Sequence, residues 1–524
     1  MDIAQPTAAP AEPPPFRRLA DLIAEHAALR PASTALVQDE RRVDYRQLDA
    51  MMDRVAATLQ RDGAVPRDAI VIVAGTSLEY AAVFLGALRA GVAVAPLPPG
   101  STAESLHAMI ADAGARFVFV DDAAARTLGP PDGATVRVAL DGSRAGRPLA
   151  QWLVPHGTRP APVDVRPDWP FNIIYSSGTT GTPKGIVQSH AMRWQHVCMG
   201  DVFGYGPQCV TLLSTPLYSN TTLVSFFPTF AWGGAVVLMA KFDALGYLKL
   251  AQSHRATHTM LVPVQYQRLM SHPDFERFDL SSFAAKFCTS APFHAALKAD
   301  VLRRWPGALV EFYGMTEGGG GCMLLAHEHP DKLHTVGQPF EGHDVRLIGE
   351  DGREVSPGEA GEVVGRSEAM MNGYQNQPGK TADATWHDDQ GRAYIRTGDV
   401  GRFDADGFLV LFDRKKDMII SGGFNVYPSD LEAVLRGHPH VADVAVVGVA
   451  SEQWGETPVA FVVPAAGAAA DPDEIRQWAN GRLGKTQRLA ALRLVDELPR
   501  SAIGKILKRE LRDAYAAQAG RGAQ

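Results

Sequence analysis

The stretch Tyr175-Ser-Ser-Gly-Thr-Thr-Gly-Thr-Pro-Lys-Gly185 is the most informative part of this chain. It follows an apolar run at residues 171–174 and gathers hydroxyl groups, glycines and one lysine in one segment. Glycines let backbone N–H groups converge on an anion, hydroxyls add hydrogen-bond donors, and Lys184 adds a compact positive charge. The segment therefore predicts a phosphate-binding loop after a strand.

The spacing in this loop differs from that of the common nucleotide-binding loop, Gly-x-x-x-x-Gly-Lys-Ser/Thr. Counted from Gly178, that pattern requires Gly at Pro183 and Ser or Thr at Gly185. The spacing argues against a Walker-type NTPase. A solvated linker rich in Gly, Ser and Thr is the alternative interpretation of the segment taken alone.

Length and charge narrow the class of protein. A chain of 524 residues is long enough for two to four domains. The formal net charge of -7 is small for this length and no basic block is present, which disfavours nucleic acid as a main partner. The longest apolar stretch, residues 69–97, contains Glu79, Arg89 and three glycines, so we expect no membrane span.

The cysteines and the N-terminal residues indicate a cytoplasmic protein. Four cysteines are widely spaced, form no Cys-x-x-Cys pair, and predict buried free thiols. Residues 1–15 are rich in Pro and Ala and lack the apolar core of a signal peptide, so we expect a disordered tail.

Alternating apolar runs and helical patterns predict an α/β fold. Between residues 16 and 164, runs at 70–74, 92–96, 117–120 and 136–140 alternate with helical patterns at 48–60 and 79–90. This alternation is typical of a parallel sheet covered by helices. A second cycle has runs at 171–174, 210–213, 235–238, 259–262 and 285–288, so we expect two related α/β halves.

The pattern changes after Pro330. Short β-type runs at 345–348, 361–364 and 408–411 predict a small antiparallel sheet or barrel. Further on, Pro428 with a Ser429-x-x-Glu432 capping box predicts a helix that ends at Gly437. We therefore expect a large domain over residues 16–413 and a smaller, mobile α+β domain over residues 414–524.

Four further segments are rich in polar residues and glycine. They are Glu311-Phe-Tyr-Gly-Met-Thr-Glu317, Arg396-Thr-Gly-Asp399, Asp413-Arg-Lys-Lys-Asp-Met-Ile-Ile-Ser-Gly-Gly423 and Pro499-Arg-Ser-Ala-Ile-Gly-Lys505. Together with the loop at 175–185, in this order, they resemble the adenylate-forming superfamily of acyl-CoA synthetases, firefly-type luciferases and peptide-synthetase adenylation domains. The resemblance covers residues 16–512.

The resemblance implies an enzyme that activates a carboxylate with ATP, forms an acyl adenylate and pyrophosphate, and passes the acyl group to CoA. Such chemistry needs orientation and positive charge more than a proton-transfer pair. Lys505 is the catalytic cation that the resemblance implies, bridging the substrate carboxylate and the α-phosphate. A surface lysine near a helix start is the plainer alternative.

The resemblance also assigns the nucleotide-binding residues. The β- and γ-phosphates are assigned to the loop, at Ser176, Ser177, Gly178, Thr179, Thr180, Gly181 and Lys184. Glu317 is expected to hold Mg²⁺ and Thr316 to contact the α-phosphate. The adenine and the acyl channel are assigned to Tyr313, Gly314 and Met315, and the adenine also to Ser290, Ala291 and Pro292, where the family usually begins with Gly. The ribose is assigned to Asp399, with Arg414 as a second contact. For Tyr313, Thr316 and Arg414 a packing or surface role is the alternative, and for residues 290–292 the alternative is a plain turn after a buried strand.

Two half-reactions imply a moving domain. Lys505 and the pair Gly422 and Gly423 lie in one small domain but serve different steps, so both cannot face the adenylate at once. The resemblance implies a rotation about a hinge at Lys416, which brings the two glycines to a pantetheine tunnel.

The acyl pocket is expected around residues 214–222. Tyr218 and Ser219 stand where many relatives carry Phe-His, and no Asp is present there to pair with an amino-acid ammonium group. Gly318 and its neighbours up to Gly321 are expected to leave space beside Met315, and Phe226, Phe227 and Met323 are further lining candidates, although plain core packing is the commoner role. These features favour a medium-chain fatty acid or an aromatic acid.

The leading hypothesis is thus an AMP-forming carboxylic acid:CoA ligase that uses ATP, Mg²⁺ and CoA, and a homodimer is an assembly that this hypothesis allows. Three alternatives stay open: an adenylation enzyme that loads a separate carrier-protein thiol, a non-catalytic binding protein on the same scaffold, and, more distantly, a luciferase-like oxygenase.

Overall fold

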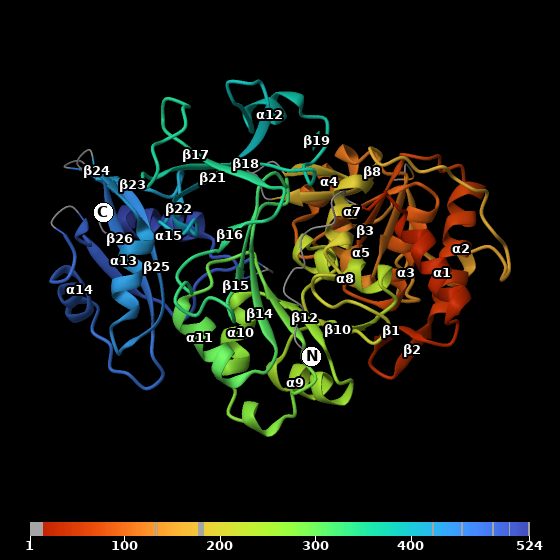
Figure 1. The fold of residues 1–524 in the computed structure, drawn as a ribbon, viewed down its shortest axis with the longest axis horizontal. Coiled ribbons are helices and arrows are strands. Elements are labelled where there is room, and N and C mark those ends of the chain that lie inside the picture. The colour runs from red at the N-terminus through yellow and green to blue at the C-terminus, as the bar shows by residue number, and fades with distance from the viewer. Residues whose placement is uncertain are drawn as a thin grey trace. The chain divides into compact units, whose positions relative to one another are not determined.

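The computed structural model describes residues 14–131, 133, 135–176, 183–421, 424–451, 454–484, 487–501 and 504–521. The chain forms two compact units (Figure 1). The first comprises Met1–Asp344 and Gly365–Ile395, and the second comprises Val345–Val364 and Arg396–Gln524.

The first sheet of the first unit has eight strands in the order β19-β9-β8-β4-β3-β5-β6-β7. The strands from β8 to β7 are paired in parallel, whereas β9 runs antiparallel to both β8 and β19. Their bounds are β3 Ala69–Val73, β4 Ala93–Leu97, β5 Phe117–Val120, β6 Val136–Ala139, β7 Arg147–Pro148, β8 Pro170–Ser176, β9 Lys184–Ser189 and β19 Gly373–Tyr374.

The second sheet of this unit has nine strands in the order β16-β15-β14-β13-β12-β10-β11-β1-β2. The strands from β14 to β1 in this order are paired in parallel. Because β1 comes from the N-terminal half of the unit and pairs with β11 of the other half, this sheet contains strands of both halves. The bounds are β1 Thr34–Gln38, β2 Arg41–Asp44, β10 Val210–Leu213, β11 Ala235–Leu238, β12 His258–Leu261, β13 Ala285–Cys288, β14 Ala308–Tyr313, β15 Cys322–Leu325 and β16 Gln338–Pro339.

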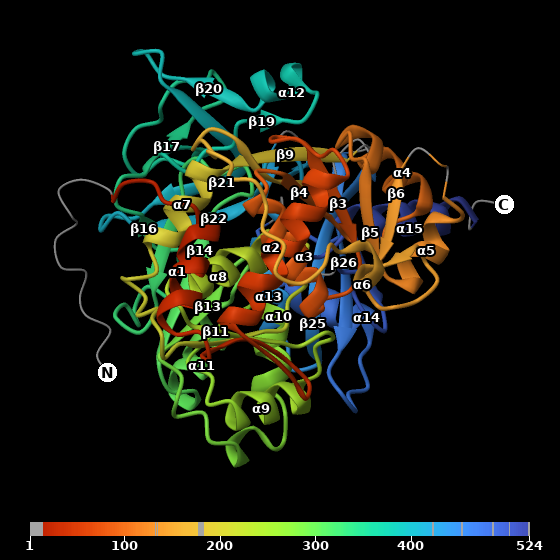
Figure 2. The same ribbon diagram turned by 90° about the vertical axis from the view of Figure 1, so that its right-hand side faces the viewer.

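Helices cover these sheets. The amphipathic helix α2 begins after Asp44, which forms a capping box with Gln47, and packs on the almost fully buried α3 (Figure 2). The helix α8 is also apolar and packs against α1, α7 and β10. The bounds are α1 Leu19–Leu29, α2 Tyr45–Arg61, α3 Leu78–Arg89, α4 Ala103–Asp112, α5 Asp122–Leu128, α6 Leu149–Trp152, α7 His190–Cys198, α8 Asn220–Ala231, α9 Ala244–Ser253, α10 Pro263–Met270, α11 Ala295–Arg304 and α12 Pro378–Asp383.

A five-stranded sheet follows in the order β17-β18-β21-β20, with β22 beside β21. The boundaries between the two units fall within β17, β18 and β21. The bounds are β17 Asp344–Ile348, β18 Gly361–Arg366, β20 Thr385–His387, β21 Ala393–Phe403 and β22 Leu409–Arg414. The predicted β-type runs after Pro330 therefore form strands of one small sheet.

The C-terminal part of the second unit contains another five-stranded sheet, in the order β24-β23-β26-β25 with β27 on β26. Buried aliphatic residues of this sheet pack against α13 and α14, forming a core separate from that of the first unit. The bounds are β23 Ile419–Ser421, β24 Phe424–Val426, α13 Pro428–Arg436, β25 Val441–Ser451, β26 Gly455–Pro464, α14 Pro472–Asn480, β27 Ala491–Leu494 and α15 Lys508–Arg521.

The helix α13 begins at Pro428 and ends before Gly437, as predicted, but the predicted capping box is wrong. The Ser429 N–H donates instead to Oδ2 of Asp413, at 2.9 Å. The Glu432 carboxylate accepts from Val446 N at 2.9 Å and pairs with Lys508 at 3.0 Å. Tertiary partners thus replace the local cap.

The mixed α/β fold class with a large and a small domain is confirmed. The boundary between a large and a small, mobile domain at residues 413 and 414 stays a prediction. The division into two compact units does not show at which residue one domain moves relative to the other. Of the predicted tail, residues 1–13 lie outside the described residues, and Pro14 and Pro15 are in neither helix nor strand.

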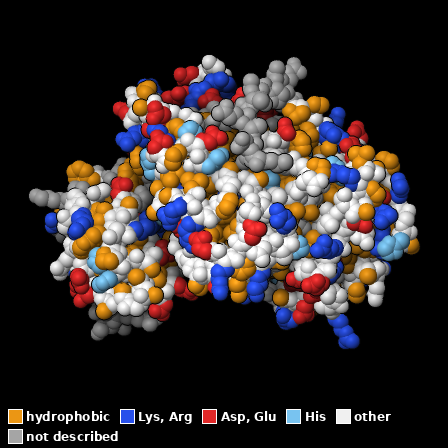
Figure 3. Space-filling view, turned by 60° about the horizontal axis from the view of Figure 1, so that its bottom comes forward, with side chains coloured by type: hydrophobic (Ala, Val, Ile, Leu, Met, Phe, Trp, Pro, Cys, Tyr) orange, Lys and Arg blue, Asp and Glu red, His pale blue; other side chains and the backbone are white. Residues whose placement is uncertain are grey.

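The surface charges, the helices and the cysteines can be compared with the composition. Figure 3 shows acidic and basic side chains interspersed over one face, with no large area of a single sign. Among the described residues, no helix combines the length and apolarity needed to cross a bilayer. All four cysteines are free, and three of them are buried.

Candidate active site

The two ends of the phosphate-binding loop are held by paired strands. Ser176 ends β8 and Lys184 begins β9, and the two residues are partners in the antiparallel ladder. The hydroxyl of Tyr175 donates to Oδ2 of Asp112 at 2.7 Å, which anchors the end of β8. The residues between them, Ser177, Gly178, Thr179, Thr180 and Gly181, lie outside the described residues, so their phosphate contacts stay a prediction.

One tyrosine connects the predicted phosphate lysine with the predicted metal ligand. Lys184 Nζ lies 5.0 Å from the ring centroid of Tyr374, and the Tyr374 hydroxyl donates to Oε1 of Glu317 at 2.9 Å. In the part of the chain that the structure describes, Lys184 has no carboxylate partner. Its charge is therefore available to an anion.

The connection between β14 and β15 carries the predicted residues 313–318. Its backbone is fixed by the segment after β18, since Met371 N donates to Glu317 O at 2.8 Å and Gly319 N donates to Ala369 O at 3.0 Å. These bonds fix the backbone at Glu317, a residue that is only 9% exposed.

The glycines of this connection serve backbone packing. A Cβ at Gly319 would lie 2.6 Å from Gly365 O, and one at Gly318 would overlap Ala369 O; both glycines have positive φ angles. The free space expected beside them is therefore filled by backbone. Gly314 differs, because among the described residues a Cβ there would meet only Gly321 Cα, at 4.0 Å. Gly314 therefore leaves room beside the described backbone.

Thr316 is held through its carbonyl. Gln188 Nε2 donates to Thr316 O at 2.7 Å, and Gln188 is itself fully buried on β9. Met315 and Thr316 are partly exposed, whereas Tyr313 is buried at the end of β14. The partly exposed Thr316 is therefore accessible to a ligand, and the role of Tyr313 at the adenine and the acyl channel stays a prediction.

The segment Ser290-Ala291-Pro292 links β13 to α11 in the first unit. Ser290 has φ of 84°, a conformation that favours glycine, which explains why Gly is the usual residue there. Its hydroxyl is hydrogen-bonded to that of Thr221, near the start of α8. The predicted adenine loop and the predicted acyl segment are therefore in contact.

Tyr218 and Ser219 precede α8 directly. Ser219 is the N-cap residue, is buried, and its hydroxyl makes no capping bond. Burial raises the pKa of the half-buried Tyr218 above its ordinary value. Together they place a neutral phenol and a small hydroxyl at the carboxyl end of β10, the edge at which parallel α/β sheets bind ligands.

In the second unit, Asp399 and Arg414 face each other across β21 and β22. They are partners in the antiparallel ladder and form an ion pair, with Arg414 Nε 3.0 Å from Asp399 Oδ1. The Asp399 N–H donates to Thr397 Oγ1 at 3.0 Å. The carboxylate predicted to bind ribose is thus held in a fixed orientation.

Lys505 belongs to the same unit. The turn before it is closed by Ser501 N, which donates to Lys505 O at 2.8 Å, with Gly504 at a φ of 76°. Burial, followed by the charges of Arg414 and Lys416, lowers the pKa of Lys505 to about 8, while Asp399 and Asp417 oppose the shift. The unit thus gathers cations that an anionic ligand would stabilise.

The structure therefore gathers the predicted residues into two sets. Lys184, Tyr313–Glu317 and Ser290 belong to the first unit, and Asp399, Arg414, Lys416 and Lys505 belong to the second. Gly422 and Gly423 lie outside the described residues. The hinge role of Lys416, whose pKa is lowered mainly by burial, stays a prediction.

The donor set suits a metal bound together with a nucleotide. Glu317 Oε1 accepts from Tyr374, and Oε2 has no partner among the described residues. In the same described ranges, no group of three or more His, Cys, Asp or Glu could hold a metal ion. One carboxylate plus phosphate oxygens is the arrangement that Mg²⁺ commonly takes.

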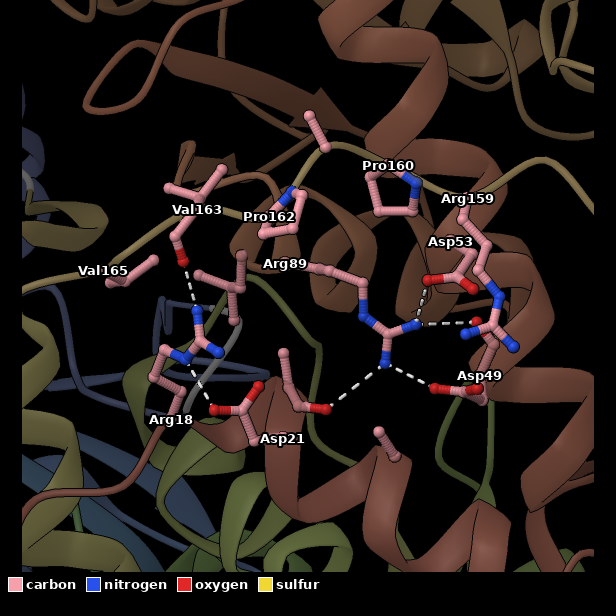
Figure 4. Close-up of a pocket in the computed structure, with 14 residues that line it drawn as sticks. Arg18, Asp21, Asp49, Asp53, Arg89, Arg159, Pro160, Pro162, Val163 and Val165 are labelled. Atoms are coloured by element: carbon pink, nitrogen blue, oxygen red, sulfur yellow. Dashed lines mark hydrogen bonds and ion pairs between the residues drawn. The ribbon is translucent and has the colours of Figure 1, made fainter.

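A cavity of about 220 Å³ in the first unit lies apart from all these residues (Figure 4). Most of its charged lining residues are paired with one another, with Arg89 2.6 Å from Asp49 and 2.7 Å from Asp53, and Arg18 2.6 Å from Asp21. None of the predicted site residues lines it. This cavity is not the candidate active site.

Sequence reasoning missed Tyr374 and the buried polar residues around Gln188. Tyr374 is 57 positions from Glu317 and belongs to no motif; only the pairing of β19 with β9 brings it close. Gln188 and Asn172 are polar residues within otherwise apolar strands. The alternation of side chains along each strand places both of them in the protein interior. Those interruptions were the available signal.

Comparison with known proteins agrees with this geometry. The family model described as AMP-binding enzyme matches residues 23–375, and that described as AMP-binding enzyme C-terminal domain matches residues 430–505. The chain belongs to this family of AMP-binding enzymes, the adenylate-forming superfamily. The predicted superfamily is thereby confirmed, and relatives named as CoA ligases and synthases confirm the predicted enzyme class, an AMP-forming acid–thiol ligase.

Three relatives are informative. A feruloyl-CoA synthase of an Amycolatopsis species is 34% identical over 93% of this chain and 97% of its own. The fatty acid–[acyl-carrier-protein] ligase ScoC of Streptomyces coeruleorubidus is 32% identical over 96% of this chain and 97% of its own. Among solved structures, the amide bond synthetase McbA from Marinactinospora thermotolerans has a TM-score of 0.84 at 29% identity, covering 95% of this chain and 99% of its own.

Proposed function

We propose that this protein is an AMP-forming carboxylic acid:CoA ligase that acts on an apolar monocarboxylate, either an aromatic acid or a medium-chain fatty acid. The observation that carries the proposal is the linked arrangement of Lys184, Tyr374 and Glu317 beside the phosphate-binding loop. A lysine that the described residues leave without a carboxylate partner, close to an oriented carboxylate, suits the binding of a nucleoside triphosphate with a metal ion.

The first half-reaction, adenylation, has residues that suit it. Adenylation requires the carboxylate to approach the α-phosphate of an anionic nucleotide, so positive charge lowers the barrier. Lys505, with Arg414 in the same unit, would supply that charge, and Asp399 would orient the ribose. Mg²⁺, held by Glu317 and phosphate oxygens, would neutralise charge on the nucleotide.

Features of the acyl segment support the proposed acid. Residues 214–222 contain no Asp or Glu, so a substrate ammonium group has no partner there. Phe226 and Phe227, on the same helix as Thr221, are fully buried and act as core residues. The feruloyl-CoA synthase acts on an aromatic acid and ScoC on a fatty acid, as their names say, which supports both options for this chain.

The main alternative function differs from the proposed one in the thiol that accepts the acyl group. ScoC is named as a ligase to an acyl-carrier protein, so transfer to a carrier-protein thiol is the second candidate function.

Location in the cytoplasm belongs to the proposal, and the four free thiols support it. A homodimer stays a prediction.

A screen for pyrophosphate release tests the proposal. Aliphatic, aromatic and amino acids are offered with ATP and Mg²⁺, with CoA, with a phosphopantetheine-bearing carrier protein, or with neither. We expect release with apolar monocarboxylates and thioester formation with free CoA. Turnover of only acetate or only dicarboxylates would overturn the proposed acid. Thioester formation on the carrier alone would establish the alternative acceptor, and no release with any acid would favour a non-catalytic binding protein.

A further inference from the structure

A buried arginine without a carboxylate partner lies beside the candidate acyl segment. Arg193 on α7 is 1% exposed, and burial lowers its pKa to about 9. Within the described ranges it forms no ion pair, and its Nη1 atom has no hydrogen-bond partner. A buried cation of this kind costs folding free energy that an apolar side chain would avoid.

Arg193 organises three amide side chains. Its Nε donates to Asn172 Oδ1 at 2.9 Å, and its Nη2 donates to Asn220 Oδ1 at 2.8 Å and to Gln188 Oε1. Asn172 and Gln188 are both fully buried. Asn172 Nδ2 in turn donates to Gln188 Oε1 at 2.8 Å.

The guanidinium determines which way each amide points. Because it has donors and no acceptor, every amide that faces it must present its oxygen. Gln188 therefore directs Nε2 away, where it donates to Thr316 O at 2.7 Å and approaches Asn220 Oδ1 at 3.4 Å. One buried charge thus orients both the backbone that carries Thr316 and the amide of Asn220.

Asn220 is the member of this network that can meet a ligand. It is the first residue of α8, follows Tyr218 and Ser219 directly, and is partly exposed. Its Oδ1 accepts from Arg193 and Gln188, so the amide cannot turn over. Its Nδ2 has no hydrogen-bond partner among the described residues. The result is an N–H donor with a fixed direction in the predicted acyl pocket.

We propose that Asn220 Nδ2 donates a hydrogen bond to an oxygen of the acid other than its carboxylate, and that Arg193 and Gln188 are positioning residues for this contact. The inference rests on the proposed function and narrows its substrate class to apolar monocarboxylates that carry a hydrogen-bond-accepting oxygen, such as an ether, a ketone or a hydroxyl group. A pocket donor held in place discriminates strongly, because a substrate without the acceptor leaves it unpaired.

Pairs of acids that differ only in that oxygen test the inference. Suitable pairs are methoxycinnamic and ethylcinnamic acids substituted at ring positions 2, 3 or 4, and 7-oxooctanoic and 7-methyloctanoic acids. We expect the wild-type kcat/KM for pyrophosphate release to favour the oxygen-bearing member of at least one pair by tenfold or more. Release with many acids and no preference in any pair would overturn the inference while leaving the proposed function intact. Release with none would contradict the proposed function instead.

Substitutions identify the donor. In Asn220→Leu the preference for that pair should fall to about onefold, whereas in Gln267→Leu, an exposed residue on α10, it should stay at the wild-type value. In Arg193→Met the preference should also fall, because the amide of Asn220 is no longer held, and Arg193→Lys should restore part of it. Thermal unfolding of each variant separates this effect from misfolding. An undiminished preference in folded Asn220→Leu would overturn the assignment.

Discussion

The hydroxyl of Tyr374 donates a hydrogen bond of 2.9 Å to Oε1 of Glu317, while the ring of the same tyrosine lies 5.0 Å from Lys184 Nζ. One side chain therefore positions the carboxylate proposed to bind the metal and contacts the lysine proposed to bind phosphate. Burial of Tyr374, with the negative charge of Glu317, raises its pKa, so the phenol stays protonated and remains a donor. The hydrogen-bond donor to Glu317 is consequently kept through the neutral pH range.

Tyr374→Phe should slow adenylation while leaving the protein folded. The ring near Lys184 is kept, and only the hydrogen bond to Glu317 is lost. Hydrogen bonds to charged groups contribute about 1.5–3 kcal/mol, so we expect pyrophosphate release to fall by at least roughly tenfold, with a higher Mg²⁺ requirement. Rates measured across a Mg²⁺ titration check this.

Tyr80→Phe is the matched control for that substitution. The Tyr80 hydroxyl is fully buried and has no hydrogen-bond partner among the residues that the structure describes, so its removal should change neither the rate nor the Mg²⁺ dependence. Equal behaviour of the two variants would contradict the assigned role of Tyr374.

Lys505→Ala should separate the two half-reactions. Removal of a preorganised charge at the reacting phosphate costs roughly 100- to 1000-fold, so adenylation should fall by that amount. Thioester formation from supplied acyl adenylate should be largely retained. Single-turnover assays of each half-reaction measure this, with Lys249→Ala, an exposed residue on α9, as the control. An equal loss in both assays would exclude the proposed division of labour.

The rate of adenylation should depend on the protonation of Lys505. Its pKa is lowered to about 8, so the ammonium form predominates below that pH and is lost as the pH rises through it. We expect kcat/KM for adenylation to decrease above about pH 8. In Lys505→Arg the residual activity should lack this decrease, because guanidinium stays charged there. An unchanged alkaline decrease in Lys505→Arg would assign it to another group.

Much of the fold could be predicted because its signals are local. Runs such as residues 210–213 and 285–288 are strands in the structure, since short aliphatic runs between turn residues fit a buried parallel sheet. The motifs likewise predicted Glu317, Lys184 and Lys505, because each lies within a short segment rich in glycine and polar residues.

What could not be predicted depends on contacts between distant residues. Tyr374 reaches Glu317 only because β19 pairs with β9. The glycines at 318 and 319 were expected to leave ligand space, yet carbonyls of residues 365–369 occupy it. Glu432 was expected to cap its own helix, but Lys508, 76 positions away, provides a charged partner. Pattern reasoning within one segment contains no information about these partners.

Ser290→Gly should be more stable than Ser290→Ala. Both variants lose the hydroxyl that bonds to Thr221, so only the backbone distinguishes them. At the φ of 84° an alanine costs about 1 kcal/mol or more relative to glycine. The free energy of unfolding from urea titrations should therefore be higher for the Gly variant by roughly that amount. Equal stability would show that the backbone relaxes to a negative φ without cost.

Substitutions at two glycines of the β14–β15 connection should change different properties, the stability at Gly319 and the KM for the acid at Gly314. In Gly319→Ala the new Cβ would lie 2.6 Å from Gly365 O at a φ of 87°, so we expect a loss of about 2 kcal/mol or more in unfolding free energy. In Gly314→Ala the nearest atom of the described residues is 4.0 Å away, so stability should change by about 0.5 kcal/mol at most. The methyl group would instead take up space beside the proposed acyl channel, and KM should rise more for bulky acids than for short ones. Because Gly314→Ala keeps the fold, a uniform KM across acids of different size would place the acyl group elsewhere.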